Sequence, residues 1–207
     1  YPPGSWVLPA QAGLGEAVAD VAHELGLDFD SAATVPSVAR HGANVPRLGV
    51  WVPWADTDSI GWIRYTLDGQ GVPYTYLRDE DIRAGGFRET VDVILYGHVD
   101  LDLQGQIHGI EPVSGPMAFA ATPEFPSLGK PVASDDITGG IGWSGLAELE
   151  RFVEDGGTLL TLGKGTALAL DGGLIRVVRS SADTGIVTPG AELRARFLQP
   201  QHPLAYG

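Results

Sequence analysis

The stretch GGTLLTLGKGTALAL, residues 156–170, decides the fold that this sequence predicts. Its apolar run is typical of a strand, its glycines mark a tight turn, and the residues after them suit the start of a helix. A strand, a sharp turn and a helix in this order form the elbow that raises a nucleophile above a sheet. No Ser, Cys or Asp stands at the tip of this turn. The turn consists of Leu162, Gly163, Lys164, Gly165 and Thr166.

Strands and helices are expected to alternate on both sides of this elbow. For example, residues 48–52 form a short apolar run, after which Asp56 and Asp58 can cap a helix. This alternation predicts an α/β fold with a parallel sheet that is doubly wound through right-handed crossovers. The expected strands cover residues 48–52, 72–77, 91–97, 158–162 and 174–178, with one more at the edge in residues 191–198. The longest expected helix, in residues 143–157, would bury Leu146, Leu149, Phe152 and Val153.

The sequence predicts two parts of unequal size. Residues 1–46 are expected to form an N-terminal arm or interdomain linker, and residues 47–207 the α/β domain. The arm should begin with a short strand at residues 5–8 and continue with one helix, which Gly26 can end. That helix is indicated by Leu14, Val18, Val21 and Leu25 at helical spacing. Residues 98–142 are rich in Gly and Pro with little periodicity, which is typical of a lid, a binding loop or an insertion.

The composition narrows the possible classes of function. The 13 basic and 26 acidic residues give a formal net charge of −13 and an isoelectric point near 4.6. Nucleic acids and anionic membranes bind basic surfaces, so we expect neither as a partner. The absence of cysteine excludes disulfides, thiolate catalysis and zinc sites of the cysteine type. No membrane-length apolar run or signal peptide is visible, and the chain, which opens at Tyr1, is interpreted as a fragment of a longer protein.

Three turns are expected to meet at the carboxyl ends of the strands, where open α/β sheets bind ligands. They are residues 53–56, residues 97–99 and the elbow. If these turns meet, their side chains can line a crevice, and free N–H groups at the helix start would admit an anion beside Lys164. A small-ligand or anion-binding module is therefore one open hypothesis. Its candidate residues are Trp54, Asp56, His98 and Lys164.

The segments around these turns resemble the class I glutamine amidotransferase-like superfamily, whose fold is a flavodoxin-like doubly wound parallel sheet. Active members carry an elbow of the kind AICHGPALL, and TLGKGTALA puts Gly163 where their nucleophilic cysteine stands. The stretch DVILYGH, residues 92–98, is similar to their oxyanion strand and loop, which would give Gly97 and His98 the oxyanion-loop positions. The usual His-x-Glu after a late strand is absent. The resemblance thus implies a degenerate elbow with no catalytic residue.

A narrower resemblance covers most of the chain. The segments VWVPW, GVPYTYLRDEDIRAG, TGGIGWSGLAELERFVEDGGTLLTLG, TPGAELRARF and HPLAYG look like the amidotransferase-like domain that follows the catalytic domain in bacterial carboxypeptidase A-type zinc metallopeptidases. This resemblance implies a secreted parent enzyme whose zinc lies in a separate peptidase domain. The chain itself would be a non-catalytic accessory domain, without a cofactor, that serves domain packing or substrate presentation. Its implied partners are that peptidase domain and a peptide or small molecule.

Enzymatic alternatives have weaker support in the residues. A hidden serine hydrolase would use Ser59, Ser144 or Thr166, which stand at expected helix starts, where capping is the usual role. The stretch HGIE, residues 108–111, matches the H-x-x-E of a carboxypeptidase zinc site, but a third ligand is needed and His202 is the only later histidine. Four aspartates could in principle bind calcium, but they lack the ligand spacing of a known calcium loop. These are Asp100, Asp102, Asp135 and Asp136.

The elbow itself gives the most specific expectation. The strand at residues 158–162 should end in a sharp turn at Gly163 and Lys164, with a helix at residues 166–170 directly after it. Gly163 should adopt backbone angles that are costly for residues with a Cβ. Gly97 should approach the elbow from the neighbouring strand. The superfamily's acid–base histidine should have no counterpart within hydrogen-bonding reach, because HPLAYG lies at the far end of the chain.

Overall fold

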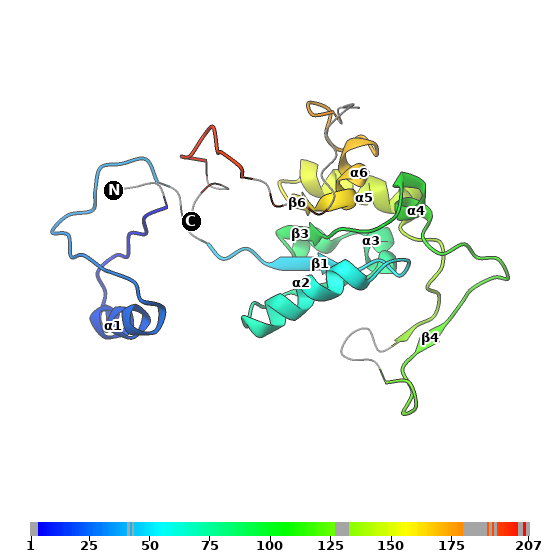
Figure 1. The fold of residues 1–207 in the computed structure, drawn as a ribbon, viewed down its shortest axis with the longest axis horizontal. Coiled ribbons are helices and arrows are strands. Elements are labelled where there is room, and N and C mark those ends of the chain that lie inside the picture. Colours follow the sequence, from blue (N-terminus) through cyan, green and yellow to red (C-terminus); the bar gives the residue numbers. More distant parts are fainter. Residues whose placement is uncertain are drawn as a thin grey trace. The chain divides into compact units, whose positions relative to one another are not determined.

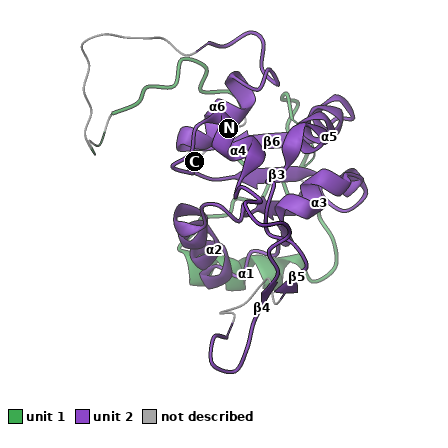
Figure 2. Ribbon diagram, turned by 90° about the vertical axis from the view of Figure 1, so that its right-hand side faces the viewer, with its two compact units in different colours: residues 1–43, 183–207 green, residues 44–182 purple. Residues whose placement is uncertain are grey.

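Two compact units make up the chain in the computed structural model, which describes residues 4–40, 42, 44–126, 133–179, 190, 192, 194–202 and 205. One unit contains residues 1–43 and 183–207, and the other contains residues 44–182 (Figure 2). The sheet and the elbow both lie in the second unit. Within the described ranges, no helix has the length and apolar character that a membrane crossing requires.

A four-stranded parallel sheet forms the centre of the second unit (Figure 1). The strand order is β2-β1-β3-β6, and Val50 of β1 lies opposite both Tyr76 of β2 and Leu95 of β3. The chain adds β2 on one side of β1 and the later strands on the other, so the direction of winding reverses at β1. The α/β class and the parallel sheet that the sequence predicted are confirmed. The strands are β1 Leu48–Trp51, β2 Thr75–Leu77, β3 Val93–Tyr96 and β6 Thr158–Thr161.

Helices cover both sides of this sheet. Figure 2 shows α2, Asp58–Gly69, on one side, and α3, Asp79–Ala84, and α5, Gly142–Glu154, on the other. The backbone N–H of Asp58 donates to the carboxylate of Asp56 at 3.3 Å, so Asp56 contacts the start of α2 as expected. The remaining short helices are η1 Phe87–Glu89, before β3, and η2 Gly163–Gly165 with α6 Thr166–Leu170, after β6.

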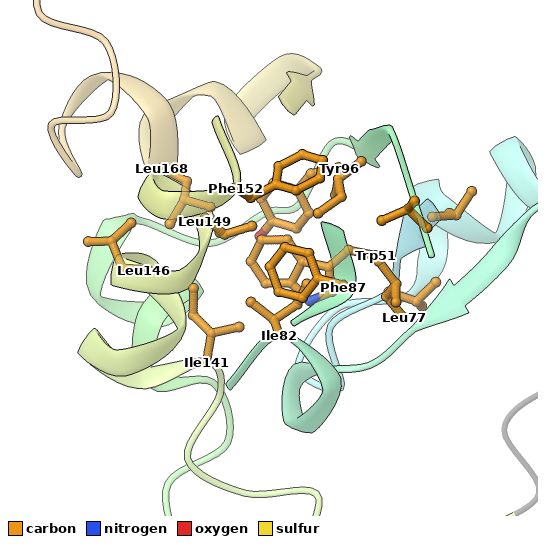
Figure 3. Close-up of a cluster of buried hydrophobic side chains, with 14 of the residues drawn as sticks. Trp51, Leu77, Ile82, Phe87, Tyr96, Ile141, Leu146, Leu149, Phe152 and Leu168 are labelled. Carbon is orange, nitrogen blue, oxygen red and sulfur yellow. The ribbon is translucent and has the colours of Figure 1, made fainter. Parts of the chain in front are cut away.

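The core between the sheet and α5 is rich in aromatic side chains (Figure 3). Trp51 and Tyr96 are fully buried and stack with ring centroids 4.0 Å apart. Phe87 of η1 and Phe152 of α5 meet at 5.4 Å. Each buried aromatic side chain removes roughly 150–250 Å² of surface from water, so these four supply much of the apolar stabilisation. Val153 was expected on the buried face of α5, but its position in the helix leaves it 40% exposed. The other core side chains labelled in Figure 3 are Leu77, Ile82, Ile141, Leu146, Leu149 and Leu168.

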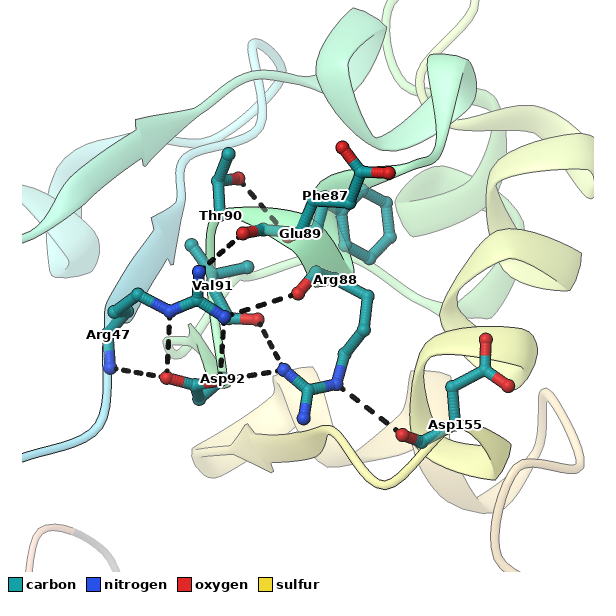
Figure 4. Close-up of polar contacts among 8 residues, drawn as sticks. All are labelled: Arg47, Phe87, Arg88, Glu89, Thr90, Val91, Asp92 and Asp155. Carbon is teal, nitrogen blue, oxygen red and sulfur yellow. Dashed lines mark hydrogen bonds and ion pairs between the residues drawn. The ribbon is translucent and has the colours of Figure 1, made fainter. Parts of the chain in front are cut away.

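A cluster of arginines around one aspartate fixes the amino ends of β1 and β3 (Figure 4). Arg47, directly before β1, donates its backbone N–H, Nε and Nη2 to the carboxylate of Asp92 at 2.9, 3.0 and 2.9 Å. Arg88 of η1 donates to the same carboxylate at 2.7 Å. The hydrogen bonds from Arg47, followed by that from Arg88, hold the pKa of Asp92 well below its usual value. Asp92 therefore acts in this fold as a polar tie between two neighbouring strands.

The described part of the first unit contains the expected helix but not the expected strands. Helix α1, Leu14–Leu25, ends at Gly26 with a φ of 64°, and none of its residues is buried. The strand predicted at residues 5–8 is wrong, and so is the edge strand predicted in residues 191–198 for the residues described there. A strand needs a neighbour for its N–H and C=O groups. No described strand pairs with either segment.

Residues 98–142 contain more regular structure than their composition suggested. Helix α4, Leu103–His108, is capped by Asp102, whose carboxylate accepts the backbone N–H of Gly105 at 2.8 Å. Six residues make fewer than two turns, which is too short for a periodic apolar pattern to show. The capping aspartate was the local signal that could have revealed this helix. A short antiparallel ladder follows, formed by β4 Phe119–Ala120 and β5 Ala133–Ser134 (Figure 1).

The fifth strand predicted at residues 174–178 is wrong. After α6, the backbone N–H of Ile175 donates to the carbonyl of Ala169 at 2.8 Å. Arg176 forms an ion pair with Glu150 of α5 at 3.0 Å. The backbone bond keeps Ile175 beside the end of α6, so the segment does not extend beside β6.

Candidate functional site

Three turns meet at the carboxyl ends of β1, β3 and β6, as the sequence predicted. Asp56, after β1, accepts the backbone N–H of Asp100, after β3, through Oδ2 at 2.6 Å. Lys164, after β6, donates its backbone N–H to Nδ1 of His98 at 3.1 Å. The turns therefore lie at the end of the sheet where parallel α/β proteins bind ligands, beside the reversal of the strand order. This meeting point is the candidate functional site.

The elbow has the backbone that the sequence predicted. Strand β6 ends at Thr161, Gly163 has a φ of 56°, and α6 begins at Thr166 after the single turn of η2. A left-handed backbone costs a residue with a Cβ roughly 1–2 kcal/mol, so glycine is favoured at the tip of the elbow. The hydroxyl of Thr166 donates to the carbonyl of Gly163 at 2.7 Å and closes the turn.

His98 fills the space that a nucleophile would occupy. A Cβ at Gly163 would overlap Nδ1 of His98 and would stand 3.0 Å from its Cβ and Cγ. The same Nδ1 accepts the backbone N–H of Lys164. In an active elbow, the N–H of the residue after the nucleophile stabilises the oxyanion. Both the nucleophile position and this donor are therefore occupied by one imidazole.

One histidine, His98 on the loop after β3, lies within hydrogen-bonding reach of the elbow. Its ring accepts a hydrogen bond from the backbone, and no described contact aims it at a serine or threonine hydroxyl. The hydroxyl of Thr166, which follows the elbow, donates to the carbonyl of Gly163 instead.

Gly97 approaches the elbow through its carbonyl group. A Cβ at Gly165 would overlap the carbonyl oxygen of Gly97 and would stand 3.1 Å from the ring of Tyr96. The missing side chain of Gly165 therefore allows the end of β3 to pack closely on the elbow. An oxyanion requires N–H donors, and a carbonyl oxygen is an acceptor. This contact therefore joins the two turns without forming an oxyanion site.

The polar groups of Lys164 are engaged within the protein. Its ammonium group forms an ion pair with Asp100, and its carbonyl accepts Nε2 of Gln106 at 3.1 Å. The ion pair lowers the pKa of Asp100 below its usual value. The two side chains are 62% and 76% exposed, so water screens the pair and it adds little to stability. It does, however, neutralise the charge that an anion would need.

An open depression of about 500 Å³ lies beside this ion pair. The elbow, the start of α4 and helix α6 line it. Its lining includes the carboxylates of Asp100, Asp102 and Asp171 and the single ammonium of Lys164. The excess of negative charge disfavours an anionic ligand here.

The remaining crevice candidates, Trp54 and Asp56, belong to different contacts. The indole Nε1 of Trp54 donates to Glu80 of α3 at 2.8 Å, and its ring lies 5.6 Å from that of Phe119 in β4. Glu80 also accepts the hydroxyl of Ser134 in β5 at 2.6 Å. Trp54 thus fastens the β4–β5 ladder to α3, whereas Asp56 joins the turns after β1 and β3.

One buried carboxylate at this edge was missed by sequence reasoning. Asp79, the first residue of α3, is 2% exposed and accepts the indole Nε1 of Trp51 at 2.8 Å and the backbone N–H of Trp54 at 3.1 Å. Burial raises the pKa of Asp79 to about 6, against the effect of these two hydrogen bonds. The available signal was its position two residues after the end of β2, at the carboxyl edge of the sheet.

The other candidates lie apart from the elbow. His108 ends α4 and packs edge-on against Trp143, with ring centroids 6.0 Å apart, and Glu111 is exposed. Asp136 accepts the backbone N–H groups of Met117 and Thr138, at 3.1 and 2.9 Å. No three His, Asp or Glu side chains converge on a possible metal position among the residues that the structure describes.

Ser59 and Ser144 lie in the first turns of α2 and α5, and His202 belongs to the first unit.

Comparisons with known proteins identify no relative: no family model matches the chain, and no curated protein or solved structure shows significant similarity to it.

Proposed function

We propose that this chain is a non-catalytic, class I glutamine amidotransferase-like domain of a larger secreted bacterial zinc carboxypeptidase. Two features of the fold support this. The all-parallel strand order with its reversal at β1 agrees with a flavodoxin-like topology. The strand, turn and helix around Gly163 stand at the carboxyl edge of the sheet, where an elbow would be. The part of the proposal that concerns the parent enzyme rests on the sequence motifs that resemble that accessory domain.

The contact between His98 and the elbow carries the non-catalytic part of the proposal. Acyl transfer at an elbow requires a nucleophile, a base and N–H donors for the oxyanion. Gly163 provides no nucleophile. Nδ1 of His98 accepts the N–H of Lys164, so its lone pair is not available to take a proton from a neighbouring hydroxyl. The oxyanion donor is used by the same bond.

In this proposal the domain packs against the peptidase domain or presents its peptide substrate, and the zinc ion is held by the peptidase domain. A small-ligand or anion-binding module is the alternative. The paired ammonium of Lys164 and the acidic lining of the depression weigh against it.

Two experiments test the proposal. The isolated chain is assayed for release of ammonia from glutamine and of C-terminal residues from peptides, with the His98→Ala variant as the control. We expect no turnover by either protein, and turnover that disappears in the variant would contradict the non-catalytic assignment. The reading frame upstream of Tyr1 is expected to encode a zinc carboxypeptidase domain. A different upstream sequence would contradict the accessory role alone.

A further inference from the structure

We propose that His98 is a proton-controlled latch on the elbow: in its neutral form it holds the backbone N–H of Lys164, and in its doubly protonated form it releases that N–H. This inference concerns a conformational device within the chain. It does not depend on the parent enzyme or on the absence of catalysis.

The bond between the elbow and His98 can form in only one protonation state. A neutral imidazole has one nitrogen that donates and one that accepts, whereas both nitrogens of an imidazolium are donors. Nδ1 of His98 accepts the N–H of Lys164 at 3.1 Å, so the ring must be neutral with its proton on Nε2. A proton on Nδ1 would face another N–H donor, and the contact would be lost.

The charged groups around His98 come from each turn that meets here. Lys164 lies on the elbow, and Asp100 follows His98 on the loop after β3 and interacts electrostatically with its ring. Asp56, on the turn after β1, accepts the N–H of Asp100. Asp102 and Asp171 line the adjacent depression. Carboxylates therefore outnumber ammonium groups among the charged side chains of the turns that meet here.

Other contacts would preserve the elbow when the latch opens. The hydroxyl of Thr166 bonds to the carbonyl of Gly163 at 2.7 Å, and the amide of Gln106 bonds to the carbonyl of Lys164 at 3.1 Å. Neither contact involves a group that titrates near neutral pH. Protonation of His98 should therefore free one N–H at the tip of the elbow, beside the open depression, without unfolding the turn.

Hydrogen exchange of the Lys164 amide, measured by NMR at about pH 5 and pH 8, tests the latch across the range in which histidine titrates. Rates are corrected for the intrinsic pH dependence of exchange. The His98→Ala variant removes the acceptor. The His98→Asn variant places an amide oxygen near the position of Nδ1 and does not titrate. The His108→Asn variant controls for the titration of a histidine that packs against Trp143 elsewhere on the surface.

Protection of the Lys164 amide in the unmodified protein should fall by about tenfold from pH 8 to pH 5, because a doubly protonated imidazole has no nitrogen that can accept this N–H. The His108→Asn variant should behave identically, and the His98→Ala variant should be unprotected at both pH values. Protection that is equal at both pH values in the unmodified protein would overturn the proposal. The same fall in the His98→Ala variant would also overturn it, since another group would then be responsible. The His98→Asn variant should keep its protection at both pH values, and a parallel loss there would count equally against the latch.

Discussion

At the carboxyl edge of the sheet, the β1–β2 side and the β3–β6 side both tie turns together with acidic side chains, but they bury these groups to different degrees. On the β1–β2 side, Asp79 is 2% exposed and accepts two N–H groups, from Trp51 and Trp54. On the β3–β6 side, the side chains of Asp100 and Lys164 are 76% and 62% exposed. Buried polar contacts are costly to break, and exposed ones are not. Stability should therefore reside on the first side, while the elbow on the second side can change state without unfolding the domain.

The largest loss of stability is expected from removing the indole of Trp51, which lies in the aromatic core on the β1–β2 side. Trp51→Ala deletes a fully buried indole, its stack on Tyr96 and a donor to Asp79. We expect a loss of about 4 kcal/mol in the free energy of unfolding, measured by urea denaturation with circular dichroism. The matched control is Trp143→Ala in α5, where the side chain is 57% exposed and the loss should be below about 1 kcal/mol. Equal losses would show that the buried side is not the centre of stability.

The second largest effect is a pH dependence that originates from Asp79. Because burial raises the pKa of Asp79 to about 6, the folded protein binds this proton more tightly than the unfolded chain does. Stability should therefore fall as pH rises from about 4 to about 6, by at most roughly 3 kcal/mol for a shift of two units. In the Asp79→Asn variant this slope should vanish. Asp92 and Asp100, whose pKa values are lowered, lose their contributions only below about pH 4, where carboxyls normally titrate. A slope that persists between pH 4 and pH 6 in the variant would assign the effect to another group.

A smaller effect is expected at the tip of the elbow. Gly163→Ala places a Cβ at a φ of 56° and against the ring of His98, and we expect a loss of about 2–3 kcal/mol. Gly173→Ala is the matched control, because its φ is 81° and no atom lies within 4 Å of the added Cβ. That change should cost only about 1 kcal/mol of unfolding free energy, from the backbone alone. If the two variants lose the same stability, His98 does not fill the space beside Gly163.

The smallest effect is expected from breaking the exposed ion pair. Lys164→Met should leave the midpoint of thermal unfolding unchanged within error, because water screens both charges. Differential scanning calorimetry of this variant and of Asp100→Asn provides the measurement. A decrease comparable to that of Trp51→Ala would remove the contrast between the two sides of the sheet edge.

The sequence predicted those parts of the fold that depend on local pattern. The run from Thr158 to Leu162 and the glycines after it determined β6 and the elbow, because strand propensity and turn chemistry agree there. The apolar run at residues 174–178 gave the same local signal, yet the backbone N–H of Ile175 bonds to the carbonyl of Ala169, so this segment follows α6 and does not pair with β6. Whether a segment joins the sheet depends on tertiary contacts, which a local sequence pattern does not predict.

The candidate site was predicted in outline only. The meeting of the three turns followed from parallel topology, and the positive φ of Gly163 followed from the elbow. The position of His98 did not, because whether a side chain on one loop enters the space beside another depends on loop geometry. The same reason concealed Asp79, whose burial and hydrogen bonds to Trp51 and Trp54 depend on the packing of separate segments.

The most direct test of the central claim, that His98 occupies the elbow, is the nitrogen–nitrogen coupling across the hydrogen bond between the Lys164 amide and His98 Nδ1. It is measured on the folded chain at about pH 8, where histidine is ordinarily neutral. We predict a resolved coupling between these two nitrogens and an imidazole that carries its proton on Nε2. A ring protonated on Nδ1, with no coupling to Lys164, would contradict the account.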